Sequence, residues 1–264
     1  MIDLYWVDLR VGADEEAAWA TLAPDETARA DRFIFEADRR RFVAGRAAVR
    51  SVLGERLDLQ PAEVRLSVDE WGKPVLAGVA GGPSFNVSHS GDVAVVAVAD
   101  GRSVGVDVEV LRPGVGDLDV ARRLFSPAER AALGAVAPED VDAAFLRVWT
   151  RKEAWVKAKG QGLSIPLHTF DVSVGPDDAT LRRAEGDSLG PSGWWLHDVS
   201  GARFGAPVVA AIAAPGPACP VVDRRVRWAP ARHPAFTWSK EAPWRQTFAP
   251  PDPGSGAFAG GGRP

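Results

Sequence analysis

The stretch WTRKEAWVKAKG, residues 149–160, gathers four basic residues around a single acid, Glu153. It closes a segment of helical periodicity, and its final glycine is typical of a helix C-terminus. Trp149, Glu153 and Lys157 are spaced by four residues and therefore share one stripe of that helix. A tryptophan in the stripe favours an inward-facing Glu153. The alternative is a solvated amphipathic helix in which Glu153 and Lys157 form a surface ion pair.

Two more acids lie upstream in SVGVDVEV, residues 103–110. In a β-strand the valines of this run face one side, while Asp107 and Glu109 face the other. Adjacent carboxylates raise each other's pKa unless a cation lies nearby, and hard divalent ions such as Mg²⁺ or Mn²⁺ bind such oxygen pairs. An edge strand with an acidic solvent face is the alternative. Glu153, if it lies close, would complete a metal site.

The order of predicted elements repeats along the chain. YWVDLR reads as a strand, two helical stretches follow, and three strand-like runs lead to residue 102. The same β-α-α-β-β-β order begins again at residue 103. The sequence therefore predicts an α+β fold of two similar lobes, residues 1–102 and 103–222, related by a pseudo-twofold axis. Residues 223–264 are rich in Pro and Gly and are expected to form a poorly ordered tail.

Composition excludes several classes of protein. The 264 residues are 46% hydrophobic and can bury a core without disulfides, and the lone Cys219 favours a reducing compartment. A net charge of −4 argues against general nucleic-acid binding. The sequence has no apolar run of membrane-spanning length, and its first ten residues carry acids where a signal peptide would be basic. We expect a cytoplasmic protein with no membrane or nucleic-acid partner.

Several polar residues are candidates for binding phosphate. FNVSHS ends in Ser88, His89 and Ser90, whose hydroxyls and imidazole beside backbone amides suit a phosphate. Their alternative role is to satisfy the backbone of the next turn. The turn WGKP adds Lys73, a compact charge that suits a phosphate. The alternative is that Lys73 is a solvated lysine of a hairpin. Five arginines between residues 29 and 41 add a basic helical region, most of it expected to be solvated.

The ordered set WGKP, FNVSHS, GVDVE, FSPAE and WTRKEAWVKAKGQGLS closely resembles the 4′-phosphopantetheinyl transferases of the large, two-lobed, surfactin-synthetase-activating type. The resemblance spans roughly residues 24–173 and is specific, because five motifs occur in the family's order. It implies the fold of that family and, as a rule, a monomer. It also implies an enzyme that moves the phosphopantetheine arm of coenzyme A onto a serine of an apo acyl, peptidyl or aryl carrier protein, with release of adenosine 3′,5′-bisphosphate.

The resemblance also implies a set of site residues. By similarity, Asp107, Glu109 and Glu153 would bind Mg²⁺ with the coenzyme A pyrophosphate, and Mn²⁺ suits the same ligands. Lys157 would contact the phosphate, and Glu153, directly or through a water that it orients, is the candidate base for the carrier serine. Glu26 stands where some relatives carry a basic residue, which puts the grip on the 3′-phosphate in doubt. The residues implied for the rest of coenzyme A are Arg29, Arg41, Gly72, Lys73, Pro74, Ser88 and His89.

Carrier proteins are as a rule acidic helical bundles. The stretch from Leu118 to Leu133, with Arg122, Arg123 and apolar positions such as Leu124 and Phe125, is expected to receive one of their helices, unless the apolar residues belong to the core. Two other functions stay open at this point. One is a Mg²⁺-dependent hydrolase of small pyrophosphates, and the other is a coenzyme A- or carrier-binding module without turnover.

Overall fold

The structure, a computed structural model, describes residues 1–10, 15–79 and 81–226. The predicted tail lies outside this range except for its first four residues. The first half of the chain contains β1 (Ile2–Asp8), α1 (Glu15–Trp19), α2 (Pro24–Ala30), α3 (Glu36–Leu57), β2 (Leu66–Val68), β3 (Pro74–Leu76), β4 (Ser84–Ser90) and β5 (Val93–Ala99).

The second half begins, like the first, with a strand followed by helices, and the fold as a whole is mixed α+β. Its elements are β6 (Gly105–Val110), α4 (Leu118–Leu124), α5 (Pro127–Gly134), α6 (Val141–Lys159), β7 (Phe170–Val172), β8 (Leu181–Ala184), β9 (Trp194–Asp198), β10 (Gly201–Arg203), β11 (Ala206–Pro215) and β12 (Val221–Arg225).

The predicted β-α-α-β-β-β order is too simple for both halves. The first of the two helical stretches expected after the first strand, over about residues 15–33, forms two helices, because Pro24 cannot continue α1 and instead starts α2. A short strand, β3, begins at the proline of the WGKP turn and pairs with β2. Residues 223–225, predicted to belong to the tail, lie in β12, which pairs in parallel with β1. The pairing partner is far away in sequence, so no local pattern reveals this strand.

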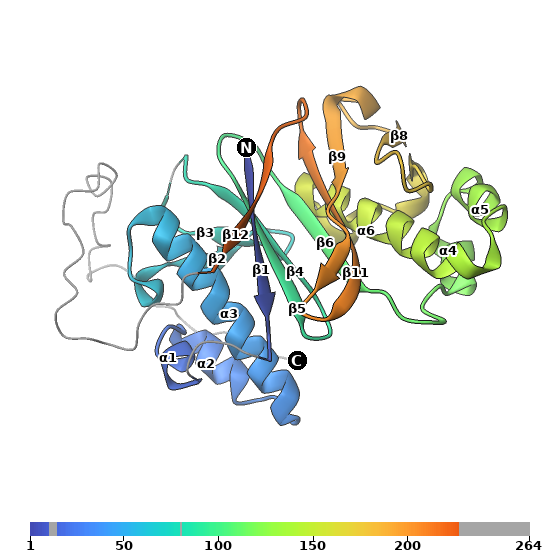
Figure 1. Ribbon diagram of the computed structural model, residues 1–264. Coiled ribbons are helices and arrows are strands. Elements are labelled where there is room, and N and C mark those ends of the chain that lie inside the picture. Colours follow the sequence, from blue (N-terminus) through green and yellow to red (C-terminus); the bar gives the residue numbers. More distant parts are fainter. Residues whose placement is uncertain (11–14, 80, 227–264) are drawn as a thin grey trace, which may run out of the picture.

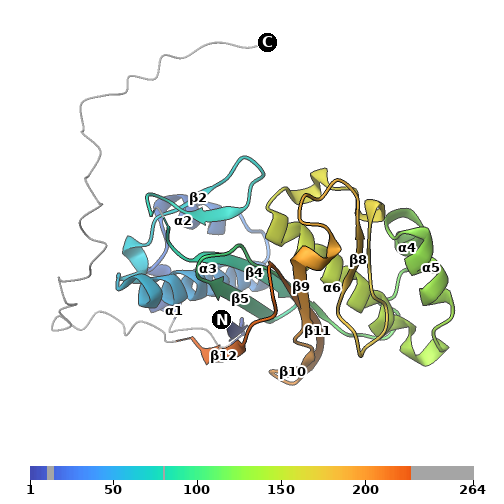
Figure 2. The same cartoon turned by 90° about the horizontal axis from the view of Figure 1, so that it is seen from above.

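Two sheets pack face to face between helices (Figures 1 and 2). One sheet has the order β12-β1-β5-β4, and the other has the order β10-β11-β6 with β9 also paired to β11. Their facing sides share one apolar core, which includes Ile2, Val95, Val106 and Ile212. Helix α3 covers the outer side of the first sheet, and α6 covers the outer side of the second. Among the described residues, no helix is both long and apolar enough to cross a membrane.

Helix α6 lies directly on β6 because Gly105 has no side chain. A Cβ on Gly105 would lie 2.0 Å from the carbonyl oxygen of Ala154 and 2.4 Å from the backbone nitrogen of Ala158. Only glycine permits this approach of two backbones. The contact holds the stripe of α6 that carries Glu153 opposite the acidic face of β6.

Strands β4 and β6 meet where the two sheets join, and side chains replace a backbone ladder there. Alternate residues of β4 provide the acceptors, and backbone N–H groups of β6 are the donors. Val106 N donates to Asn86 Oδ1 at 2.9 Å, Val108 N to Ser88 Oγ at 3.4 Å, and Val110 N to Ser90 Oγ at 3.1 Å. These bonds satisfy N–H groups on an edge of β6 that would otherwise be buried without partners.

Candidate active site

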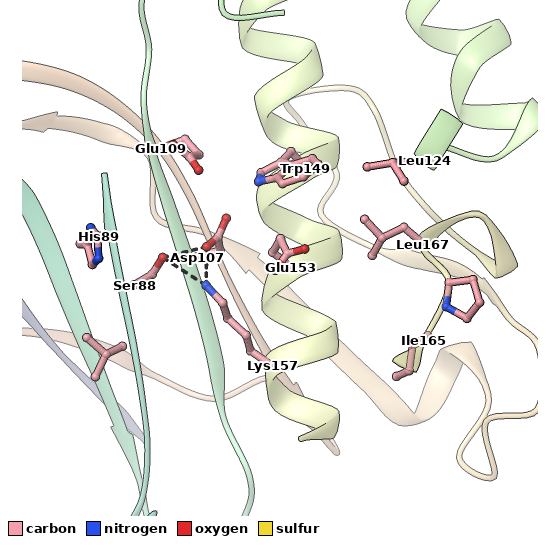
Figure 3. A pocket seen from close by; sticks show the side chains of 12 residues that line it. Ser88, His89, Asp107, Glu109, Leu124, Trp149, Glu153, Lys157, Ile165 and Leu167 are labelled. Atoms are coloured by element: carbon pink, nitrogen blue, oxygen red, sulfur yellow. Dashed lines mark hydrogen bonds and ion pairs between the residues drawn. The ribbon is translucent and has the colours of Figure 1, made fainter. Parts of the chain in front are cut away.

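A cavity of about 590 Å³ lies between β4, β6 and α6 (Figure 3). The predicted acids of β6 and α6 share it with residues of the FNVSHS motif and with an apolar wall. The lining residues are Val87, Ser88, His89, Asp107, Glu109, Leu124, Trp149, Glu153, Lys157, Ile165, Pro166 and Leu167. The inward orientation predicted for Glu153 from the WTRKEAWVKAKG stretch is therefore confirmed, and the solvated alternative is wrong.

Asp107 is the most deeply buried of the three acids, with 4% of its surface exposed. Its Oδ1 atom accepts hydrogen bonds from Lys157 Nζ at 2.5 Å and from Ser88 Oγ at 2.7 Å. Its Oδ2 atom is buried and has no hydrogen-bond partner among the described residues. A buried carboxylate oxygen without a partner is costly, so this atom can accept a cation or a donor from a ligand.

Glu109 follows Asp107 by two residues on β6, and Glu153 comes from α6. Ser90 Oγ donates to Glu109 Oε2 at 2.6 Å, and Glu153 points from α6 into the cavity. Within the described ranges, no group of three or more His, Cys, Asp or Glu side chains is arranged to hold a metal by itself. The three acids thus line one cavity, while Lys157 occupies one oxygen of the central acid.

Burial raises the pKa of all three acids. Burial is the main cause for Asp107, against the opposing pull of Lys157. Burial also raises the pKa of Glu109 and Glu153, and the charge of Asp107 adds to the effect on each. Three carboxylates share one nearby lysine, so negative charge is in excess. An all-oxygen donor set with excess negative charge and an unpartnered oxygen fits a hard divalent cation such as Mg²⁺.

The opposite wall of the cavity is apolar and depends on a lysine that sequence reasoning left without a role. Lys152 is fully buried and pairs with Glu129 at 2.8 Å. Its ammonium also donates to the carbonyl oxygens of Leu167 at 2.7 Å and Phe170 at 2.6 Å, and it lies over the Phe170 ring. These bonds fix the loop that brings Leu167 to the cavity. The signal available in the sequence was that Lys152 directly precedes Glu153, so its side chain lies about 100° around the helix from the stripe of Glu153.

A second cavity, of about 530 Å³, adjoins the first and shares Val87 and His89 with it. Arg29 and Arg41, two of the residues predicted to bind coenzyme A, line this cavity. The Arg41 guanidinium already pairs with Asp92 at 2.8 Å and with Asp38 at 3.1 Å. Arg29 is exposed, and its guanidinium carbon lies 5.1 Å from the centroid of the Phe42 ring.

Glu26 does not face this second cavity. Its side chain is 5% exposed and forms ion pairs with Arg46 and, at 2.6 Å, with Arg50. Both arginines belong to α3, so the ion pairs hold α2 against α3. The acid at position 26 is thus a structural residue in this chain, although the pair with Arg46 neutralises an arginine that lines the cavity.

The WGKP turn lies away from both cavities. Lys73 Nζ donates to the carbonyl oxygen of Lys157 at 2.7 Å, with a longer contact to that of Val104 at 3.4 Å. Burial lowers the pKa of Lys73. Gly72 has a φ of +81°, as the tight turn requires, and Pro74 begins β3. In this structure Lys73 therefore binds the end of α6 across the junction of the lobes.

The α4–α5 segment agrees only in part with the predicted carrier-docking surface. Arg122 and Arg123 are exposed, and Leu124 is half-buried and lines the first cavity. Phe125 is not an exposed contact, as it is 2% exposed and its ring lies 5.2 Å from that of Phe145. The core alternative is correct for Phe125 because it follows the last residue of α4 and packs under α6.

Two family models match most of the chain. A model of the 4′-phosphopantetheinyl transferase superfamily matches residues 103–211, and a model of the N-terminal part of a 4′-phosphopantetheinyl transferase matches residues 12–100. Among solved structures, the holo-[acyl-carrier-protein] synthase of Thermotoga maritima is similar at 18% identity and a TM-score of 0.33, over 43% of this chain and 62% of that chain.

Relatives with assigned names share the sequence more closely. The 4′-phosphopantetheinyl transferase HetI of Nostoc is 41% identical over 64% of this chain and 73% of its own length. The 4′-phosphopantetheinyl transferase Sfp of Bacillus subtilis is 32% identical over 62% and 71%, respectively. The human L-aminoadipate-semialdehyde dehydrogenase-phosphopantetheinyl transferase is 32% identical over 59% and 54%. The chain belongs to the 4′-phosphopantetheinyl transferase superfamily and is an enzyme of that class.

Proposed function

We propose that this enzyme transfers the 4′-phosphopantetheine group of coenzyme A to a serine of an apo acyl or peptidyl carrier protein and releases adenosine 3′,5′-bisphosphate in a Mg²⁺-dependent reaction. One observation carries the proposal. Three carboxylates from β6 and α6 line one cavity with Lys157, and the central acid keeps a buried oxygen that has no hydrogen bond within the described residues. A pyrophosphate with its divalent ion supplies the positive charge and the oxygen ligands that this cavity lacks.

Asp107, Glu109 and Glu153 would hold the ion. Mg²⁺ keeps few protein ligands and takes the rest from water and substrate phosphates, so a ready-made three-acid cluster is not required. Asp107 Oδ2 is the atom best placed to bind it, because Oδ1 accepts from Lys157 and Ser88. When bound, the ion neutralises charge that develops on the pyrophosphate oxygens during transfer. Mn²⁺ is expected to replace it.

The transfer step forms one bond and breaks one bond. The carrier serine oxygen bonds to the phosphorus that carries the pantetheine, and the bond from that phosphorus to the bridging oxygen breaks, so that adenosine bisphosphate leaves with the electron pair. Glu153 is the proposed acceptor of the serine proton, directly or through a water. Burial and the nearby Asp107 raise the pKa of Glu153, which makes it a better proton acceptor than an ordinary carboxylate.

The adenosine end would extend toward the second cavity. His89 lines both cavities and is exposed, so its imidazole can contact a phosphate between them. Arg29 and Arg41 line the far part and are the proposed contacts for the 3′-phosphate. Lys157 is the proposed phosphate contact in the first cavity. A coenzyme A-binding role for Gly72, Lys73 and Pro74 stays a prediction.

The two lobes would be related by a pseudo-twofold axis, and the enzyme would act as a monomer. Supporting the axis, β1 pairs antiparallel with β5, and the first strand of the second half, β6, pairs antiparallel with β11. The monomer rests on the resemblance to the two-lobed family alone. Sedimentation of the enzyme with saturating coenzyme A at a dimer mass would contradict the monomer.

The carrier partner would dock beside α4. Arg122 and Arg123 are exposed there, and carriers from fatty acid, polyketide or nonribosomal peptide synthesis are acidic helical bundles. Leu124 connects this surface to the cavity. Reversal of both arginines to glutamate is expected to raise the KM for the carrier without changing that for coenzyme A. An unchanged carrier KM would move the docking surface elsewhere.

A transfer assay tests the proposed function. The enzyme, coenzyme A, Mg²⁺ and an apo carrier domain are incubated, and the carrier is weighed by mass spectrometry. The carrier should gain the phosphopantetheine mass, and Asp107→Asn should lower turnover by two or more orders of magnitude, typical of losing a group that acts on the transition state. Exposed Glu70 supplies the control variant, Glu70→Gln, which should keep full turnover. Cleavage of coenzyme A without carrier gain would indicate a hydrolase, and binding alone would indicate a non-catalytic module.

A further inference from the structure

Two serines of β4 make the same pair of hydrogen bonds, two residues apart. Ser88 Oγ donates to Asp107 Oδ1 at 2.7 Å and accepts from Val108 N at 3.4 Å. Ser90 Oγ donates to Glu109 Oε2 at 2.6 Å and accepts from Val110 N at 3.1 Å. Each serine thus binds one acid of β6 and the backbone of the next residue. The match follows from the period of two on both strands.

Both hydroxyl hydrogens are already used. A serine hydroxyl has one hydrogen to donate, and in Ser88 and Ser90 that hydrogen goes to a carboxylate. Ser88 also accepts from Lys157 Nζ at 3.2 Å, so both of its lone pairs have partners. With this arrangement neither serine has a hydrogen left for a substrate phosphate. His89, between them on the strand, is exposed and lines both cavities.

We propose that Ser88 and Ser90 are positioning residues that fix Asp107 and Glu109 for the metal ion, with Ser90 acting on Glu109 alone. The inference rests on the proposed role of these acids as metal ligands. Glu109 is half-buried, and of its carboxylate oxygens only Oε2 has a hydrogen bond among those that the described residues show. Without Ser90 the carboxylate would be free to rotate out of the cavity, and ordering it would oppose metal binding.

Removal of the Ser90 hydroxyl is expected to lower the affinity for the metal ion and to leave the affinity for coenzyme A unchanged. Hydrogen-bond partners of metal ligands typically change metal affinity by about 10–100-fold. Mn²⁺ is titrated by electron paramagnetic resonance with coenzyme A present and no carrier. Ser90→Ala should lower the Mn²⁺ affinity about 10-fold. Ser90→Thr keeps the hydroxyl, and its Mn²⁺ affinity should stay within about 3-fold of that of the original enzyme. Ser84 lies on the same strand at an alternate position, and Ser84→Ala is the matched control that should bind normally.

A double-mutant cycle separates the positioning role from a general loss of structure. Once Glu109→Gln has removed the acid, adding Ser90→Ala should lower the Mn²⁺ affinity no further. The hydrogen bond from Ser90 that this second change removes no longer positions a charged ligand. Equal effects of Ser90→Ala with and without Glu109 would show that the serine acts only on the fold, and would overturn the inference. So would normal Mn²⁺ binding by Ser90→Ala.

The cycle also distinguishes failure of this inference from failure of the proposed function. If the original enzyme does not bind Mn²⁺ with coenzyme A, or if Glu109→Gln binds it as well as the original enzyme, then Glu109 is not a ligand and both proposals fail at that residue. If Glu109→Gln binds weakly while Ser90→Ala binds normally, only the positioning role is wrong.

Discussion

The two lobes each bury a group of charged side chains, and the two groups differ in how completely they are paired. In the first lobe Glu26 lies between Arg46 and Arg50, and Arg50 also donates to the carbonyl oxygens of Pro61 and Val64. Burial acts to raise the pKa of Glu26, but the backbone N–H of Ala23 and the two arginines outweigh it and lower the pKa. This group has its charge matched by partners within the fold.

At the junction of the lobes the balance is reversed. Asp107, Glu109 and Glu153 share Lys157, an oxygen of Asp107 has no hydrogen bond within the described chain, and the pKa of each acid is raised. A buried charge that only supports the fold is paired, because an unpaired one is costly. An excess of buried acids is therefore the pattern expected of a group that binds a ligand. Removing an acid from the paired group should lower the stability of the fold, whereas removing one from the group at the junction should raise the stability of the metal-free fold.

The largest effect on the free energy of unfolding is expected for Glu26→Ala. Removing this acid leaves the buried guanidinium of Arg50 without its counter-charge, and breaking a buried ion pair in this way costs about 3–5 kcal/mol. Urea unfolding followed by circular dichroism measures the loss. At a temperature where the variant is folded, its Mn²⁺ affinity should equal that of the original enzyme. A stability within 1 kcal/mol of the original would place Glu26 with the functional acids instead.

A smaller effect is expected for Lys73→Met. The change keeps the half-buried aliphatic stem but removes the ammonium that binds the carbonyl oxygen of Lys157. Hydrogen bonds to charged groups contribute about 1.5–3 kcal/mol, and relief of burying the charge offsets part of that, so we expect a loss of about 1–2 kcal/mol. The KM for coenzyme A should change little.

The resemblance to the family implies the opposite result for Lys73. A lysine that held the adenosine bisphosphate would give a large increase in the KM for coenzyme A with normal stability. Thermal unfolding and steady-state kinetics on the same preparation decide between the two. Exposed Glu70, in the same turn, provides the control Glu70→Gln, which should alter neither quantity.

The sequence predicted the elements that carry a strong local period. The helix that ends at Gly160 and the alternating faces of β6 are both confirmed. A helix or strand that buries one face needs apolar residues at a fixed spacing along its own sequence. The pattern can therefore be read without knowing the rest of the fold. The motifs also led to the correct superfamily, and the three acids do line one cavity.

What the sequence did not reveal depends on contacts between distant segments. Nothing local to WGKP shows that Lys73 reaches the end of α6, and nothing local to Ser90 shows that it bonds Glu109. The role of Gly105 is of the same kind, since its need for a bare Cα comes from a helix about fifty residues later. Strand β12 pairs with β1 across almost the whole described chain. Such features follow from the fold and not from a residue's neighbours.

The smallest effect on the free energy of unfolding is expected for Glu153→Gln. The sign of this effect is the sharpest test of the difference between the two groups of charges. The pKa of Glu153 is raised in the folded enzyme above its ordinary value of 4.5, by burial first and by Asp107 second. A group with a raised folded pKa contributes stability that is present below the unfolded pKa and is lost as pH rises through the folded pKa. Above that window the charged Glu153 therefore weakens the metal-free fold.

In EDTA at pH 7.5, Glu153→Gln should be more stable than the original enzyme, because its side chain carries no charge to be buried or to be repelled by Asp107. Loss of the repulsion alone is worth about 0.5–1 kcal/mol, and loss of the buried charge adds to it. The gain should shrink as the pH falls toward 4.5, where the original side chain becomes neutral. With Mg²⁺ and coenzyme A the order should reverse, because the ion stabilises only the enzyme that binds it well. Urea unfolding at each pH measures the difference. A Gln variant that is less stable in EDTA would mean that the junction acids are already paired like Glu26, and that their excess charge does not mark a ligand site.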